Sequence, residues 1–137
     1  MESGIESLLN RPYCIIDILP CQVPQDSAGQ YFRVEKYFLG KAEIAEIKRK
    51  HLNIILKLNC YRDISLEEEG KLNPAPDETA KAVMNYPVHI MMKDMMLVSE
   101  PDETYMTLFN PDDDTLELVK KITAGEGLFV WKPQETG

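Results

Sequence analysis

Residues 88–109 read VHIMMKDMMLVSEPDETYMTLF, and this stretch decides how the rest of the chain is interpreted. Two apolar runs, 88–98 and 105–109, lie on either side of a polar stretch that contains a Pro-Asp pair. Apolar runs of this length separated by turn-forming residues are typical of two strands joined by a hairpin. We therefore predict a β-hairpin here and a sheet at the centre of the fold.

Four of the seven methionines lie close together in the first apolar run. If this run forms one strand, its alternation places Met92 and Met96 on one face and Met91 and Met95 on the other. Both faces would then be apolar, one in the core and the other covered by a helix or by a second subunit. Methionine suits either place, since its flexible side chain fills core gaps and also forms adaptable binding surfaces.

Outside this segment, alternating apolar residues predict further strands, and apolar residues spaced by three and four predict helices. The predicted strands are 13–19, 52–61 and 128–131. Helices are predicted after a Ser27 cap, over 41–50 beyond a break at Gly40, over about 77–84, and from Pro111, capped by Asn110, to Gly125. The segment 52–61, LNIILKLNCY, alternates most regularly and predicts a strand with one polar face.

This order of elements predicts an α+β fold with one mixed sheet of about five strands and helices mainly on one face. If the hairpin is simplified, the order of elements approximates βαββαβ. The candidate topology is therefore ferredoxin-like, with an extra short helix. A chain of 137 residues has the size of a single domain, 1–137. We expect 1–11 and 133–137 to be loosely ordered tails, and 62–76 to be a long polar loop.

The negative charge of the chain is concentrated in one part of the sequence. The net charge is −8, and residues 94–119 hold eight acidic residues and no basic one. Binding to nucleic acid or to an anionic membrane surface needs clustered Lys and Arg, so both are disfavoured. A local negative field instead attracts a basic protein partner. The candidate partner-binding residues are Glu100, Asp102, Glu103, Asp112, Asp113 and Asp114.

These acidic residues have two other interpretations, and the first of them stays open. Asp at a helix start and in a turn serves capping and backbone geometry, which explains the carboxylates without any ligand. A calcium loop would need a glycine at its sixth position, and the sixth residue from Asp112 is Glu117. We therefore predict no metal site.

Asp17 and Cys21 are the candidates for a small-molecule or catalytic site. Asp17 interrupts an apolar strand, and if both faces of that strand are covered its pKa should rise through burial. The alternative, which we favour, is that Asp17 faces solvent on the open side of the sheet or at its edge. Cys21 follows the same strand in the loop 20–30, where a nearby helix N-terminus would lower a thiol pKa. No Cys-X5-Arg or Cys-X-X-Cys pattern supports catalysis by Cys21.

The remaining cysteines and histidines carry no recognisable motif. Cys14 and Cys60 are interpreted as core residues, and the odd number of widely spaced cysteines is typical of reduced thiols. His51 is expected to decorate the end of a basic helix, and His89 begins a strand. Their spacing matches no zinc site, and no phosphate-binding or nucleophile motif is present, so we expect no cofactor.

These observations predict a non-catalytic interaction or regulatory protein that meets a basic protein partner. The N-terminus lacks the features of a signal peptide and no apolar run spans a membrane, so a cytoplasmic location is expected. The helix around Tyr31 and Phe38 is apolar over a wide arc, which favours a homo-oligomer. The alternative is a small-ligand-binding protein or a thiol enzyme that uses Cys21 with Asp17.

Overall fold

The computed structural model describes residues 8–67 and 70–133. Within them the strands are β1 (Tyr13–Asp17), β2 (Ser65–Leu66), β3 (Lys71–Leu72), β4 (Val88–Met92), β5 (Met95–Ser99), β6 (Met106–Phe109) and β7 (Phe129–Trp131). The helices are η1 (Gln25–Ser27), α2 (Ala28–Phe38), α3 (Lys41–Asn59), α4 (Pro76–Asn85) and α5 (Asp113–Gly125). None of these helices is both long and apolar enough to cross a membrane.

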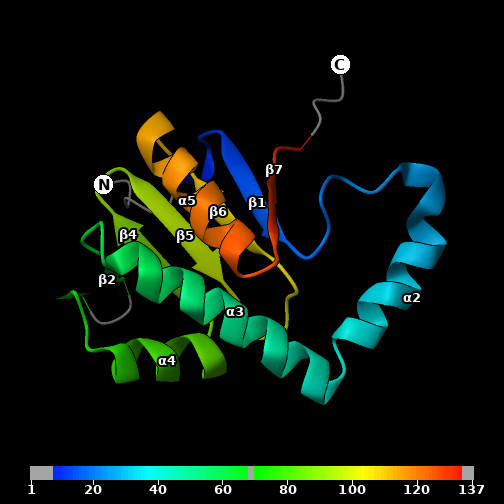
Figure 1. Cartoon of the computed structure of the whole chain (residues 1–137), viewed down its shortest axis with the longest axis horizontal. Coiled ribbons are helices and arrows are strands. Elements are labelled where there is room, and N and C mark those ends of the chain that lie inside the picture. The colour runs from blue at the N-terminus through cyan, green and yellow to red at the C-terminus, as the bar shows by residue number, and fades with distance from the viewer. Residues whose placement is uncertain (1–7, 68–69, 134–137) are drawn as a thin grey trace.

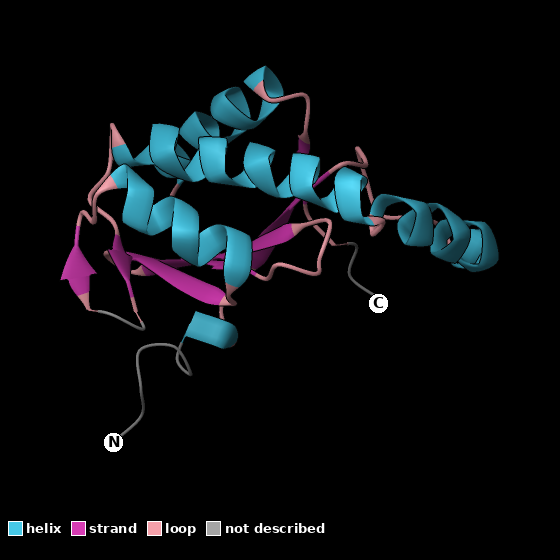
Figure 2. Ribbon diagram, turned by 90° about the horizontal axis from the view of Figure 1, so that it is seen from below, coloured by secondary structure: helices cyan, strands magenta, loops and turns pink. Residues whose placement is uncertain are grey.

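The described strands form one seven-stranded sheet in the order β3-β2-β4-β5-β6-β1-β7, and every pair is antiparallel. Helices α3, α4 and α5 cover one face of the sheet (Figures 1 and 2). The α+β class is therefore confirmed. The prediction of about five strands in a mixed sheet is wrong, and the order does not confirm a ferredoxin-like plan.

Part of the difference lies in the predicted loop 62–76, which contains β2 and β3. The predicted tails lie mostly outside the described residues, since 1–7 and 134–137 are not described. Leu8, which lies within the first predicted tail, is buried against Met96 and Phe109 on the sheet face away from the helices.

The apolar run 88–98 is a hairpin in itself rather than one strand. Strands β4 and β5 pair around a tight turn at Lys93–Asp94, where Lys93 has φ of 53°. The turn makes Met92 pair with Met95, and Met91 with Met96, so the predicted division of the methionines between the two faces is wrong. Met92 and Met95 belong to the core beneath the helices, and Met96 lies in the cluster on the other face.

The predicted strand 52–61 is wrong, because this segment forms the second half of α3. Seven residues of α3 are buried: Ile47, Lys48, His51, Leu52, Ile54, Ile55 and Leu58. Their spacing includes the steps of three and four that place residues on one side of a helix. The apolar residues of 52–60 therefore fit two patterns at once: the alternation of a strand, and the helical spacing that begins at Ile47.

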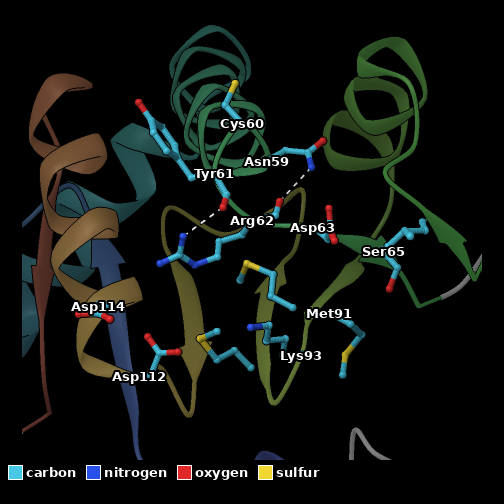
Figure 3. A pocket seen from close by; sticks show the side chains of 13 residues that line it. Asn59, Cys60, Tyr61, Arg62, Asp63, Ser65, Met91, Lys93, Asp112 and Asp114 are labelled. Carbon is cyan, nitrogen blue, oxygen red and sulfur yellow. Dashed lines mark hydrogen bonds between the residues drawn. The ribbon is translucent and has the colours of Figure 1, made fainter.

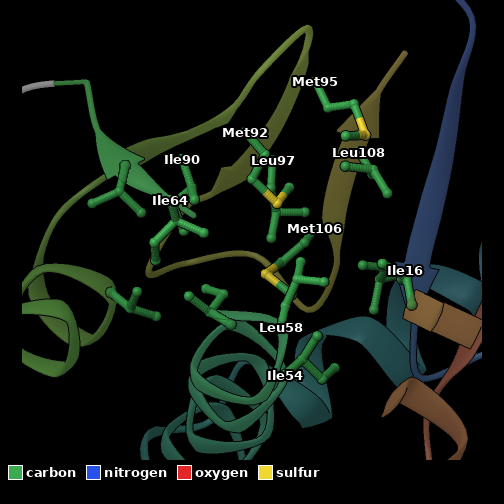
Figure 4. Close-up of a cluster of buried hydrophobic side chains, with 14 of the residues drawn as sticks. Ile16, Ile54, Leu58, Ile64, Ile90, Met92, Met95, Leu97, Met106 and Leu108 are labelled. Atoms are coloured by element: carbon green, nitrogen blue, oxygen red, sulfur yellow. The ribbon is translucent and has the colours of Figure 1, made fainter. Parts of the chain in front are cut away.

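The main core fills the space between the sheet and the three covering helices (Figure 4). Ile54 and Leu58 of α3 pack there with strand residues such as Ile16, Leu97 and Met106, all at most 1% exposed. Burial of large apolar side chains is the main favourable term in folding, at about 2 kcal/mol for each one. Because these strand side chains point toward the helices, the alternate side chains of each strand point to the opposite face of the sheet.

Several predicted elements are confirmed. A break at Gly40 separates α2 from α3, and the predicted short helix is α4. Helix α5 begins two residues later than predicted, because Asp112 is its N-cap and accepts a 2.7 Å hydrogen bond from the Thr115 amide. Asn110 instead adopts φ of 58° and donates to the Asp94 carbonyl, which joins the start of α5 to the β4–β5 turn.

Helix α2 projects from the rest of the molecule (Figure 1). None of its described residues is buried, and Phe32 and Tyr37 are each 62% exposed. The wide apolar arc predicted for this helix is thus present without a covering layer among the described residues.

Candidate functional site

A cavity of about 330 Å³ lies on the sheet face opposite the helices, beside Asp17. Its lining residues are Tyr13, Ile15, Asp17, Gln22, Tyr31, Tyr105, Trp131 and Pro133. Four of these eight side chains are aromatic and one is a carboxylate. The lining, as far as the chain is described, contains no lysine or arginine.

The alternation of β1 explains why these residues meet. Cys14 and Ile16 point into the core beneath the helices, so the residues between and beside them point to the other face. Ile15 pairs with Trp131 of the edge strand β7, which brings the indole next to the β1 side chains. Tyr31 comes from α2 and Tyr105 from the loop before β6, so four separate segments supply the aromatic walls.

Asp17 lies on the sheet face opposite the helices, as we favoured, but it is only 7% exposed, so the expectation that it faces solvent is wrong. Its Oδ1 accepts a 2.7 Å hydrogen bond from the Ile18 amide, and its Oδ2 accepts a 3.2 Å bond from Trp131 Nε1. Burial raises the pKa of Asp17, and these hydrogen bonds oppose the rise because they stabilise the carboxylate. The second bond also fixes the indole against the carboxylate.

Further carboxylates surround the cavity. Tyr31 donates a 3.0 Å hydrogen bond to Glu35, and burial together with Glu35 raises the pKa of Tyr31 to about 12. Burial and the negative charges of Glu103 and Glu100 raise the pKa of Tyr105. The two tyrosines thus lie in a negative field, which disfavours the phenolate and favours a bound cation.

Cys21 does not share this cavity. Its side chain is exposed, and from the loop after β1 it is Gln22 that lines the space beside Asp17. The structure therefore separates the two residues that the sequence placed together as a candidate site. The prediction that Cys60 is a core residue is also wrong, because that thiol is exposed, whereas Cys14 is buried as expected.

The six predicted partner-binding carboxylates do not form one surface. Glu100, Asp102 and Glu103 lie in the loop between β5 and β6, at the end of the sheet near Tyr105. Asp112–Asp114 follow the opposite end of β6, beside the β4–β5 turn. Strand β6 separates the two groups, so the idea of a single acidic end is wrong.

The second acidic group borders a larger hollow of about 790 Å³ (Figure 3). Asp112 and Asp114 face Arg62 and Lys93 across it, so charges of both signs line the same space. The Arg62 guanidinium is held by the protein itself, through Nε to Thr115 Oγ1 at 3.2 Å and through a terminal nitrogen to the Tyr61 carbonyl at 3.1 Å. Because acidic and basic side chains both line this hollow, its charge favours neither an anionic nor a cationic ligand.

A buried polar cluster was missed by the sequence reasoning. Lys48 is 2% exposed, and its Nζ donates a 2.7 Å hydrogen bond to Ser99 Oγ. Burial lowers the pKa of Lys48 to about 8, against the raising effect of Glu103, Asp102 and Glu100. Reading 41–59 as one helix would have found Lys48, because it lies one turn from Ile44 and from Leu52 on the apolar side.

His51 belongs to the same cluster and is fully buried, so its predicted place at an exposed helix end is wrong. Burial, followed by the charge of Lys48, lowers its pKa to about 3, while the nearby Thr104 backbone acts in the opposite direction. Within the described residues neither ring nitrogen has a well-formed hydrogen bond, so the Thr104 contact is a weak one.

Glu103 connects this cluster with the cavity. Burial raises its pKa to about 7, and hydrogen bonding to Glu100 acts in the same direction. Tyr105 contacts the same carboxyl, and Lys48 lies in its field.

Comparison with known proteins adds no relative: no family model, curated protein or solved structure matches this chain. Among the described residues, no group of three His, Cys, Asp or Glu is placed to hold a metal ion.

Proposed function

We propose that this protein is a non-catalytic interaction protein whose partner is a basic protein segment, and that the segment meets the cavity beside Asp17. One observation supports the proposal above others: four aromatic residues and a buried carboxylate line the cavity, with no basic residue among its described lining. Aromatic rings attract cations through their electron-rich faces. A basic side chain entering the cavity would also provide a counter-charge for Asp17.

The carboxylates outside the cavity extend this preference to the surrounding surface. Glu35 lies on α2, and Glu100 and Glu103 lie in the β5–β6 loop, so two segments add negative charge at the edge of the cavity. Charges in this position act mainly on the rate of association and on the choice of partner. We therefore assign partner recognition to Glu100, Asp102 and Glu103, and not to Asp112–Asp114.

A binding experiment with a lysine-rich peptide at increasing salt concentrations tests this proposal. Charge reversal by Glu35→Lys with Glu100→Lys should weaken binding and flatten its salt dependence, because long-range attraction is screened by salt. The matched control is Asp113→Lys with Asp114→Lys, which makes the same change of charge at the other end of β6. Equal effects of the two pairs would show that only net charge matters, and the proposal would fail.

The alternative function is a small-ligand-binding protein that uses the same cavity. The concave shape and the single convergent carboxylate favour it, since ligand sites combine an apolar lining with few polar groups. The thiol-enzyme version has no such support, because Cys21 lies outside the cavity lining.

Four further properties belong to the proposal. Self-association would use the exposed aromatic residues of α2, such as Phe32 and Tyr37. The methionine-rich alternative is weaker, because Met92, Met95 and Met96 are buried within the chain.

We also propose a cytoplasmic location and a single domain. Finally, the inner order β7-β1-β6-β5, with α3 and α5 in the connections, suits a βαββαβ plan with added strands.

A further inference from the structure

We propose that the cavity beside Asp17 binds an alkylated ammonium group, carried either by a methylated lysine side chain or by a small quaternary amine. The inference rests on the proposed function and names the chemistry of the cation. It is carried by the combination of four aromatic residues with one buried carboxylate in a cavity of about 330 Å³.

The aromatic lining is the first argument. Tyr13, Tyr31, Tyr105 and Trp131 line the space from four different segments. Tryptophan has the strongest attraction for cations among the aromatic side chains. Enclosure by several aromatic rings is the usual way in which proteins recognise quaternary ammonium groups. Ile15 adds an apolar wall that suits methyl groups.

The small number of charged hydrogen-bond acceptors is the second argument. A lysine ammonium brings three N–H donors and an arginine brings five, and donors left unpaired on burial are costly. Asp17 is the only carboxylate of the described lining, and part of its acceptor capacity is already used by the Ile18 amide and by Trp131. An alkylated ammonium has few N–H groups or none, so it enters this lining with less loss than an unmodified lysine or arginine.

Charge provides the third argument. The Asp17 carboxylate is buried with hydrogen bonds but with no cation among its described partners. Glu35 is close enough to Asp17 to disfavour its ionised form. A cation in the cavity would stabilise the ionised carboxylate, which gives the site a preference for a charged ligand over a neutral one of the same shape.

The single tryptophan of the chain makes the test direct, because Trp131 lines the cavity and its fluorescence reports on occupancy. The probes are tetramethylammonium, choline, a trimethyllysine peptide, the same peptide with unmodified lysine, and the neutral analogue of choline with carbon in place of nitrogen. We expect a saturable change with the alkylated cations, at an affinity about tenfold above that of the neutral analogue and of the unmodified peptide. Tighter binding of the peptide than of choline would identify a peptide ligand, and the reverse order a small molecule.

Matched variants locate the binding. Tyr105→Leu and Asp17→Asn should each weaken binding of tetramethylammonium, because one removes an aromatic wall and the other the negative charge. Tyr86→Leu is the control, since Tyr86 is 57% exposed and lies outside the cavity lining. Calorimetric titration replaces fluorescence if the variants change the Trp131 signal, and circular dichroism checks that they fold.

Two results would overturn the inference: equal affinity for choline and its neutral analogue, or unchanged binding in both Tyr105→Leu and Asp17→Asn. The results also distinguish a failure of this inference from a failure of the proposed function. If a lysine-rich peptide binds in a manner that depends on Glu35 and Glu100, while methylation has no effect, only the alkylammonium inference fails. If no cation binds at all, both fail.

Discussion

The ammonium of Lys48 donates a 2.7 Å hydrogen bond to the hydroxyl of Ser99, a residue 51 positions further along the chain, and both side chains are buried. The bond ties α3 to the end of β5, at the point where the acidic loop of Glu100–Glu103 begins. A buried ammonium is tolerated only when its donors are satisfied and negative charge lies near. Ser99 accepts a hydrogen bond from one of the three donors, and the loop carboxylates provide the negative charge.

Ser99→Ala should therefore destabilise the protein by about 1–3 kcal/mol, because it leaves a buried charged donor without its partner. Urea denaturation measures the loss. The double variant Lys48→Met with Ser99→Ala is the control, and it should lose less, since it removes the charge together with its partner. A Ser99→Ala protein as stable as the parent would show that another acceptor serves Lys48.

The burial of His51 predicts sensitivity to acid. Its pKa is about 3 in the folded protein and about 6.5 when exposed, so between these values the unfolded chain binds the extra proton. The free energy of unfolding should therefore fall as pH decreases from 6.5 towards 3. His51→Gln should reduce this dependence, as measured by thermal or urea unfolding across the range. Parallel curves for the two proteins would contradict the assignment.

Glu103 predicts the opposite trend over a partly overlapping range. Its folded pKa of about 7 exceeds the ordinary 4.5, so between these values the folded protein binds more protons than the unfolded chain. Its contribution to stability is thus present below pH 4.5 and is lost as pH rises through 7. Relative to the parent, Glu103→Gln should gain stability over this window. Asp102→Asn, at an exposed neighbouring position, is the control and should show a smaller change.

The projecting helix α2 gives a prediction about local stability. A helix without buried residues gains little from tertiary packing, so its backbone hydrogen bonds should open readily. Hydrogen exchange followed by mass spectrometry should show faster exchange in α2 than in α3, which buries seven residues. Protection of α2 that increases with protein concentration would instead indicate that a second copy covers it.

Helix α5 was predictable because its signals are local. The aspartates at its start, a proline before the first turn and a glycine near its end mark its limits within a few residues. Gly40 similarly marks the boundary between α2 and α3. Such signals act through neighbouring backbone groups, and distant contacts do not change them.

Two of the wrong predictions, for 88–98 and for 52–61, arose where local signals were absent or ambiguous. The β4–β5 turn contains Lys93–Asp94 rather than a glycine pair, and Lys93 takes the left-handed conformation that glycine normally supplies. In α3 the apolar residues fit both periods, and packing against the sheet decides between them. Short apolar runs are ambiguous for this reason.

The cavity could be predicted only in part. Asp17 was recognisable as a polar residue in an apolar strand, but its partners Trp131, Tyr105 and Tyr31 lie at distant positions. Only the sheet order brings β7 beside β1 and places the β5–β6 loop near both. A pairwise contact between Asp17 and Trp131, 114 residues apart, leaves no trace in spacing or composition.

The two outermost strands have a consequence for the behaviour of the protein at high concentration. At one border β7 has three residues and is followed by Lys132 and Pro133, and at the other β3 has two. Edge strands this short expose few backbone groups to a neighbouring molecule. Beyond β7, Pro133 has no amide hydrogen to donate to such a neighbour. We therefore expect edge-to-edge pairing between molecules to be weak even at high concentration.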